Sequence, residues 1–294
     1  SVDPFYFVQK KANSMTANAI NGFLNFNQKW QNAAELNNPL SVLVLNLMPT
    51  KQATERQFLE SFNHMKQDVR FTFAYPESHS FKGTSRTAMA SSYLKFSDAA
   101  QKDYDALIIT GAPVETLNFE QVDYWQEFKQ IIGWSHEHVK QTLFECWACQ
   151  AALKVEFNVK KRDLLEKTFG IYSATQINLK SPLVKGFGVE NQLRMPQSRH
   201  TNIEQTHGVE VIASNDKIGP MILYAPQINQ TYLTGHPEYE ADTLKIEYER
   251  DLGKKQRIQI PTNYFDDQNR IRYTWKRSSH LIYQNWLNLI HRKN

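Results

Sequence analysis

Four short apolar runs alternate with amphipathic segments along the first half of the chain. The runs lie at 41–47, 69–75, 103–113 and 141–145, and they are rich in β-branched or aromatic residues. Such runs are typical of strands that are buried on both faces. Apolar residues at helical spacing follow at 52–62, 122–140 and 148–157. The alternation predicts an α/β fold, a three-layer sandwich with a mostly parallel sheet between two layers of helices.

The pattern changes toward both ends. We interpret the polar, Asn-rich residues 1–38 as an N-terminal cap with a helix around Thr16–Trp30. A strand is predicted at 208–214, a hairpin from the runs 221–225 and 231–236, and a closing helix over 238–252. We therefore expect a single domain over 1–294, with the α/β core at 39–252 and a C-terminal extension, 253–294, packed on it.

Composition narrows the class of protein. The 294 residues are 41% hydrophobic and 22% charged, as in ordinary globular chains. The net charge of +4 comes from scattered basic residues, so we expect no nucleic-acid partner. The sequence contains no apolar run of membrane-spanning length and no signal-peptide pattern, so we expect no membrane association. Two cysteines cannot form a disulfide framework, which favours a reducing, cytoplasmic location.

Four loops follow predicted strands: Met48–Lys51, Gly111–Glu115, the segment that starts at Cys146, and Gly235–Glu238. In open parallel sheets, binding sites form beyond the carboxyl ends of the strands. We therefore expect these four loops to meet at one edge of the sheet and to carry the chemistry.

Both cysteines lie in the stretch FECWACQAA, at 146 and 149. A C-x-x-C pair beside a strand and a helix fits a redox motif, although the Glu145 carboxylate would oppose thiolate formation. The pair could also be half of a metal site, for which His136 and His138 are the nearest candidates. A structural zinc site needs four ligands, however, and there is no second cysteine pair.

The third interpretation makes Cys146 a nucleophile. Cys146 lies where a strand turns into a helix, as in a nucleophile elbow, and Cys149 falls one turn later on the packed side. His236 ends another strand and could act as the base, with Glu238 orienting its ring. A thiolate and an oxyanion would both be favoured at the helix N-terminus.

Eight motifs in order resemble the homoserine O-acyltransferase family, of the succinyl- or acetyl-transferring type. They are NLMPTK (46–51), ITGAPVE (109–115), CWACQA (146–151), EKTFGIY (166–172), SRHT (198–201), TGHPEY (234–239), NYF (263–265) and NWLN (285–288). The resemblance spans about residues 41 to 290 and implies the flavodoxin-like fold of class I glutamine amidotransferases.

The resemblance also implies a role for each matching residue. Cys146 would accept the acyl group, His236 would be the general base, and Glu238 would be its partner. Glu115 would select acetyl-CoA over succinyl-CoA, and backbone N–H groups near Trp147 would hold the oxyanion. The expected substrate-binding residues are Lys51, Lys167, Ser198 and Arg250. Acetyl-CoA is expected as a co-substrate, with no resident cofactor or metal, and a homodimer is expected.

The sequence departs from the family pattern around the acceptor site. Ala148 and Cys149 replace the usual Gly-Ala after Cys-Trp, and Gln197 stands where a His usually precedes the serine. We therefore expect a ping-pong O-acetyltransferase that acts on L-homoserine, in methionine or cysteine biosynthesis, with L-serine as the alternative acceptor. A succinyl donor, a glutamine amidohydrolase and a non-catalytic binding protein remain the other readings.

Overall fold

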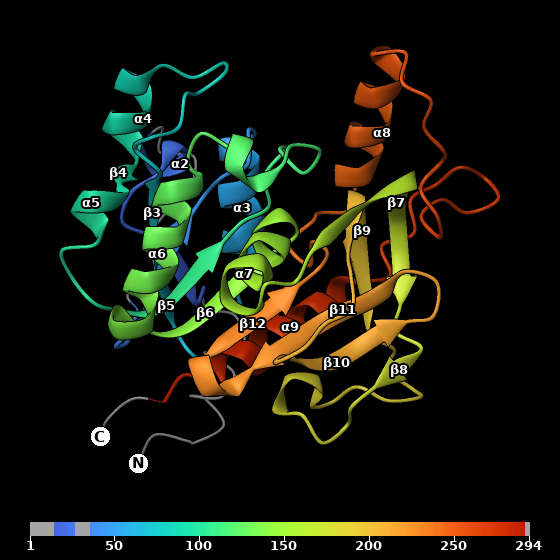
Figure 1. The fold of residues 1–294 in the computed structure, drawn as a ribbon. Helices are drawn as coiled ribbons and strands as arrows, with labels where there is room; N and C mark the ends of the chain where they lie inside the picture. The colour runs from blue at the N-terminus through green and yellow to red at the C-terminus, as the bar shows by residue number, and fades with distance from the viewer. Residues whose placement is uncertain (1–14, 27–35, 292–294) are drawn as a thin grey trace.

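A ten-stranded sheet forms the centre of the protein (Figure 1). The computed structural model describes residues 15–26 and 36–291. The strand order is β1-β3-β2-β5-β6-β12-β11-β10-β8, with β4 paired to β3. Neighbouring strands from β1 to β12 are parallel, and β12, β11, β10 and β8 are antiparallel. The predicted mostly parallel α/β sheet is confirmed, and so is the hairpin, formed by β11 and β12.

The sheet strands are β1 Ala17–Ala19, β2 Leu40–Leu45, β3 Val69–Tyr75, β4 Leu94–Lys95, β5 Tyr104–Ile109, β6 Val139–Glu145, β8 Gln176–Ile177, β10 Glu210–Asn215, β11 Gly219–Ala225 and β12 Gln230–Leu233. The helices are α2 Phe23–Phe26, α3 Lys51–Ser61, α4 Arg86–Ser92, α5 Phe96–Ala99, α6 Trp125–His138, α7 Trp147–Phe157, α8 Thr243–Gly253 and α9 Lys276–Leu287. Short 3₁₀ turns lie at Phe119–Gln121, Pro182–Val184 and Pro226–Ile228.

Two apolar cores lie on opposite faces of the sheet. Along β2, Val42 and Val44 join the core that contains α3 and α9, whereas Leu43 and Leu45 join the core that contains α5, α6 and α7. Successive side chains of a strand point to opposite faces, so a strand covered on both sides must be apolar throughout. This is the physical reason for the continuous apolar runs in the sequence.

A second, two-stranded antiparallel sheet was not predicted. It consists of β7 Lys161–Ser173 and β9 Arg194–Ile203, and it projects from the main sheet toward α8 (Figure 1). Gly170 of β7 has φ of 140°, and an added Cβ would lie 2.3 Å from the Thr262 carbonyl oxygen. Glycine therefore lets the C-terminal segment cross this sheet at backbone contact distance. The solvent-exposed outer half of β7, which includes Leu165, explains why the strand pattern was weak.

The helix predicted around Thr16–Trp30 is wrong in its first part. Residues Ala17–Ala19 form β1, which pairs in parallel with Val69–Phe71 at the sheet edge, and only Phe23–Phe26 are helical. Pairing with β3 satisfies the backbone groups of Ala17–Ala19, and this tertiary contact overrides a weak local preference for helix. Residues 27–30 of the predicted helix lie outside the described residues.

The other observed element boundaries differ from the predicted ones by a few residues. The closing helix begins at Thr243 rather than at 238, so Glu238 lies in a loop. The C-terminal extension contributes α9, whose residues Ile282, Tyr283 and Trp286 pack in the same core as Phe62 of α3. In the described part of the chain, no helix is both long and apolar enough to cross a membrane.

Candidate active site

The four predicted loops meet at one cavity of about 440 Å³ beyond the carboxyl ends of β2, β5, β6 and β12. Met48, Ala112, Cys146 and His236 each contribute from a different loop. The small sheet and α8 close the opposite side. The polar or charged side chains of this wall include Lys167, Ser198, His200, Glu247, Arg250 and Asp251.

Cys146 sits at a sharp turn between β6 and α7. Its φ of 50° and ψ of −114° are unusual for a residue with a side chain, and its N–H donates to the Leu233 carbonyl oxygen at 2.9 Å. Such a turn presents the thiol at the top of the sheet. Trp147 begins α7, so its N–H is among those that the helix itself leaves without an acceptor. The local geometry suits a nucleophile with an oxyanion site beside it.

His236 is held on three sides. Its Nδ1 lies 2.8 Å from Oε1 of Glu238, its N–H donates to the Pro196 carbonyl oxygen at 2.9 Å, and its ring stacks on Tyr239 at 4.3 Å between centroids. His236 and Glu238 are both buried. Because Glu238 occupies Nδ1, the other ring nitrogen, Nε2, is the one available toward the cavity.

Gly111 packs between the cysteine and the histidine. A Cβ at this position would lie 2.8 Å from Cε1 of His236 and 3.1 Å from Cβ of Cys146. The absence of a side chain here allows the two catalytic candidates to share one end of the cavity.

Substitution Gly111→Ala is expected to lower kcat/KM by about 100-fold, because the new methyl group must push the imidazole and the thiol out of alignment. Gly133→Ala in α6 is the matched control, since nothing lies within 4 Å of its added Cβ. The control should retain activity and gain about 0.5–1 kcal/mol of stability. Steady-state kinetics and thermal unfolding of both variants check this, and equal activities would contradict the packing argument.

Burial raises the pKa of the Cys146 thiol, and the neighbouring His236 opposes this rise without cancelling it. Burial by itself lowers the pKa of His236, but its interaction with Cys146 and the nearby carboxylates raises it above the ordinary 6.5 overall. A nucleophilic Cys146 would therefore need a base to remove its proton. His236 could serve as that base in its neutral form, through Nε2.

The pH dependence of kcat/KM follows from these directions. As pH rises through the pKa of His236, the imidazole loses its proton and becomes able to act as a base. Since that pKa lies above 6.5, the acid limb of the profile should have its midpoint above 6.5, with activity lost below it. A midpoint below 6.5, in assays with saturating second substrate, would contradict this assignment.

The far wall of the cavity carries both signs of charge. Ser198 donates to Glu247 at 2.7 Å, and Glu247 also accepts from the Tyr239 hydroxyl at 2.7 Å. Lys167 and Arg250 both contact the Asp251 carboxylate, at 3.2 and 2.8 Å. Cations and carboxylates spaced in this way suit a zwitterionic amino acid.

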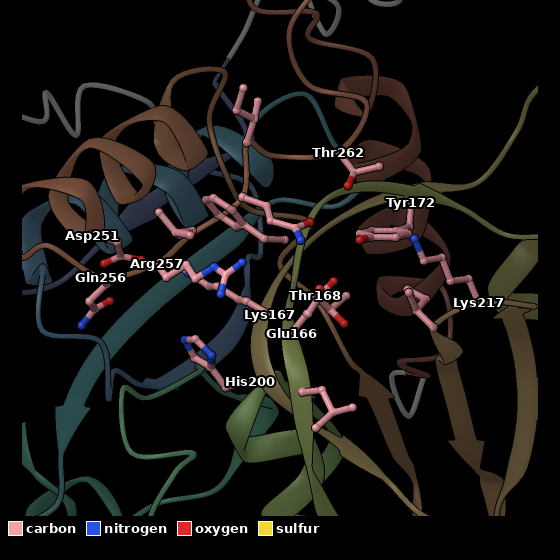
Figure 2. Close-up of a pocket in the computed structure, with 16 residues that line it drawn as sticks. Glu166, Lys167, Thr168, Tyr172, His200, Lys217, Asp251, Gln256, Arg257 and Thr262 are labelled. Carbon is pink, nitrogen blue, oxygen red and sulfur yellow. Dashed lines mark hydrogen bonds and ion pairs between the residues drawn. The ribbon is translucent and has the colours of Figure 1, made fainter.

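A second pocket, of about 410 Å³, adjoins this wall. Lys167, His200, Asp251 and Gln256 line both cavities. Figure 2 shows the Lys167 and His200 side chains lying toward Arg257 inside this second pocket. The two cavities are therefore neighbours that share a wall, and the second offers additional basic groups near the first.

Of the expected pocket residues Glu115 and Lys51, Glu115 lines the cavity and Lys51 does not. Glu115 lines the Cys146 cavity, and its carboxylate accepts from the His200 N–H at 2.9 Å and the Thr201 hydroxyl at 3.2 Å. The structure places Lys51 outside this cavity. Its ammonium donates to the Asn46 and Met48 carbonyl oxygens, both at 2.6 Å, and burial lowers its pKa to about 7. Lys51 thus braces the loop that follows β2.

The alternatives for the cysteine pair can be compared with the structure. Cys149 lies in the apolar core against α6, and burial raises its pKa to about 12, which disfavours a resolving thiolate. His136 and His138 have separate partners, Glu156 and Asp103. These two histidines therefore do not join the cysteines in a metal site. The two cysteines have different surroundings, because Cys146 lines the cavity and Cys149 lies in the apolar core.

Several polar residues of the site were missed by sequence reasoning as site residues. Glu247 and Asp251 belong to the segment EYERD, where alternating charges looked like an ordinary exposed helix face. Arg199 was also missed: it is fully buried and donates at 2.9 Å to the equally buried Gln197, which the sequence had already singled out. A fully buried arginine supported by polar neighbours has no local sequence signal, because its burial depends on β9 packing against the main sheet.

Comparison with known proteins agrees with this geometry. The family described as homoserine O-succinyltransferase matches residues 12–294. The chain belongs to this family. It is 42% identical to the homoserine O-acetyltransferase of Lactococcus lactis subsp. lactis (strain IL1403) over 258 residues, 85% of this chain and 80% of that protein. It is 39% identical to the homoserine O-acetyltransferase of Bacillus licheniformis over 262 residues, 85% of each chain.

Solved structures extend the family's fold to more distant proteins. A glutamine amidotransferase from Thermotoga maritima matches with a TM-score of 0.58 at 13% identity, covering 87% of this chain and all of that one. One from Methylobacillus flagellatus matches with a TM-score of 0.56 at 9% identity, covering 87% and 96%. These likenesses show the fold, and the expected class I glutamine amidotransferase-like architecture is confirmed.

Proposed function

We propose that this member of the homoserine O-succinyltransferase family is an O-acetyltransferase that moves an acetyl group from acetyl-CoA to the hydroxyl of L-homoserine. The observation that carries the proposal is the Cys146–His236–Glu238 arrangement at a cavity whose far wall holds Arg250 and Lys167 on the Asp251 carboxylate. The acetyl donor is favoured by Glu115, whose negative charge at the cavity would repel a succinyl carboxylate.

In the first half-reaction, His236 takes the proton from the Cys146 thiol as the sulfur attacks the acetyl-CoA carbonyl carbon. The tetrahedral oxyanion lies against backbone N–H groups at the start of α7, including that of Trp147. Collapse breaks the bond to the CoA sulfur, which leaves with the proton from His236. The product is an acetyl thioester on Cys146, which keeps the acyl group activated.

In the second half-reaction, the acceptor hydroxyl attacks this thioester and gives its proton to His236. Collapse returns the Cys146 sulfur, which recovers the proton. Arg250 has a planar guanidinium suited to the acceptor's α-carboxylate, and Ser198 and Glu247 form a hydrogen-bonded pair suited to its ammonium group. Throughout, Glu238 keeps the His236 ring in the tautomer that these transfers require.

The test is acetyl transfer from acetyl-CoA to L-homoserine and L-serine, measured side by side. A higher kcat/KM for acetylation of L-homoserine than for acetylation of L-serine supports the proposal. Serine and homoserine differ by one methylene, which is worth only about 1–3 kcal/mol, so both need measuring in the same assay. Preferred acetylation of serine would overturn the acceptor assignment, and glutamine hydrolysis without any acyl transfer would overturn the activity.

Neutralising Glu115 tests the donor assignment. In Glu115→Gln, the succinyl carboxylate no longer meets a negative charge, and kcat/KM for succinyl-CoA should rise by about tenfold or more relative to acetyl-CoA. Glu120→Gln, a nearby surface change outside the cavity, is the control. Competition between the two donors, read by product mass, measures the ratio, and an unchanged ratio in Glu115→Gln would refute the electrostatic account.

A further inference from the structure

A second carboxyl group lies behind the histidine, one residue before the nucleophile. Glu145 is the last residue of β6, and it is fully buried. Strand alternation puts it on the same face as Leu143, in the direction of α9, whereas Phe144 faces the other core. Burying a carboxyl group among these apolar side chains is costly unless it has hydrogen-bond partners.

The partners come from two elements distant in sequence. The Tyr283 hydroxyl of α9 donates to Oε1 of Glu145 at 2.6 Å and lies 3.4 Å from Oε2 of Glu238. The Glu145 and Glu238 carboxyl groups lie within reach of a shared hydrogen bond, and one oxygen of each lies within 4.8 Å of a His236 ring nitrogen. All four side chains are buried.

Counting hydrogens shows that the cluster lacks one. Two carboxylates offer four oxygens, and the three donors are the Nδ1–H of His236, the hydroxyl of Tyr283 and the backbone N–H of Glu238. Oε2 of Glu145 has no partner among the residues that the structure describes. One proton on this oxygen would satisfy it, because it could be donated to Glu238. Two carboxylates at this separation in a buried site do not both ionise.

We propose that Glu145 stays protonated in the active enzyme and donates this proton to Glu238, so that the pair shares one negative charge behind His236. Glu145 is thus a positioning residue, which acts through Glu238 and does not touch the substrate. Burial and the adjacent Glu238 carboxylate raise the pKa of Glu145 well above its usual range, in agreement with this arrangement. The effect on catalysis rests on the proposed function, whereas the protonation itself does not.

The shared charge sets the basicity of His236. Two ionised carboxylates would stabilise the imidazolium strongly and delay its return to the neutral base. One charge, spread by hydrogen bonds from Glu145 and Tyr283, stabilises it less. The other charged or titratable groups that influence His236 are Cys146 in front of it and Glu247 from α8. From α3, the Phe62 ring packs on Tyr283 at 4.7 Å and keeps this side apolar.

Infrared spectroscopy tests the protonation without any turnover. At about pH 8, far above the ordinary glutamic acid pKa, the wild-type protein should show a protonated-carboxyl carbonyl band that shifts in D₂O. Glu145→Gln should lack this band, and Tyr283→Phe, which removes the hydrogen bond to Oε1, should shift its frequency. If Glu145→Gln does not fold, the shift in Tyr283→Phe still assigns the band to the Glu145–Glu238 pair. Absence of the band, or a band indifferent to these variants, overturns the proposal.

The acid limb of kcat/KM distinguishes a neutral from an ionised Glu145. Glu145→Gln keeps a donor toward Glu238, so the midpoint should move by no more than about 0.3 unit. Glu145→Leu removes the donor, so kcat should fall by about tenfold and the midpoint should rise. If Glu145 were ionised, Glu145→Gln would remove a charge near His236 and lower the midpoint by about one unit or more.

A bound metal ion is the other way to satisfy this cluster. Stoichiometric metal in the purified protein, with the carboxyl band present only after chelation, would therefore also overturn the proposal. These outcomes differ from failure of the proposed function, in which acyl transfer is absent while the band persists.

Discussion

Substitution of Cys146 by alanine is expected to remove both the acyl-enzyme and at least about 10⁴-fold of the turnover. The thiol forms the covalent bond in the proposed mechanism, and removing a nucleophile costs about as much as removing a whole catalytic set. Incubation of the wild type with acetyl-CoA alone should add one acetyl group, seen by intact mass. The adduct should be absent from Cys146→Ala.

Cys149→Ala provides the matched control, three residues along the same segment. Its side chain is buried in the core, so the variant should keep the adduct and lose only about 1–2 kcal/mol of stability from the cavity it leaves. An adduct that survives in Cys146→Ala, or one lost in a folded Cys149→Ala, would refute the assignment. Absence of any adduct on the wild type would remove the covalent route altogether.

Glu238→Gln is expected to lower kcat by about 10³–10⁴-fold with little change in fold. The amide keeps the shape of the carboxyl group but can present an N–H to Nδ1 of His236, which would place the ring proton on Nε2. The imidazole then cannot accept the proton of Cys146. Loss of the negative charge also removes stabilisation of the imidazolium formed during transfer.

Glu240→Gln is the control for this second prediction. Glu240 lies two residues along and pairs with Arg56 at 2.7 Å on the surface, so its change should affect activity less than twofold. Rates of acylation and of acyl transfer, measured separately, should both fall in Glu238→Gln, because His236 moves a proton in each step. A full rate in either step would show that Glu238 does not orient the base.

The sequence determined the layers of the fold and the edge of the sheet at which the candidate site forms. Strands buried on both faces must be apolar throughout, so β2, β3, β5 and β6 were readable as runs. Parallel strands share an edge for their carboxyl ends, so Cys146 and His236 could be placed together from more than 80 residues apart in sequence. The edge strand β1 and the partly exposed strand β7 lacked such constraint and were missed.

The tertiary structure decided which polar residues act together. Lys51 belongs to the NLMPTK motif, and other residues of this motif line the cavity. Its own ammonium, however, is held outside the cavity by carbonyl groups of the loop that follows β2. In the sequence, Glu145 is known only as the neighbour of Cys146, so its carboxylate was expected to oppose a thiolate there. Only the docking of α9 brings Tyr283 against Glu145 and Glu238, and only burial makes their shared proton necessary. Local sequence carries periodicity and turn chemistry, whereas burial and proton sharing depend on contacts between elements far apart in the chain.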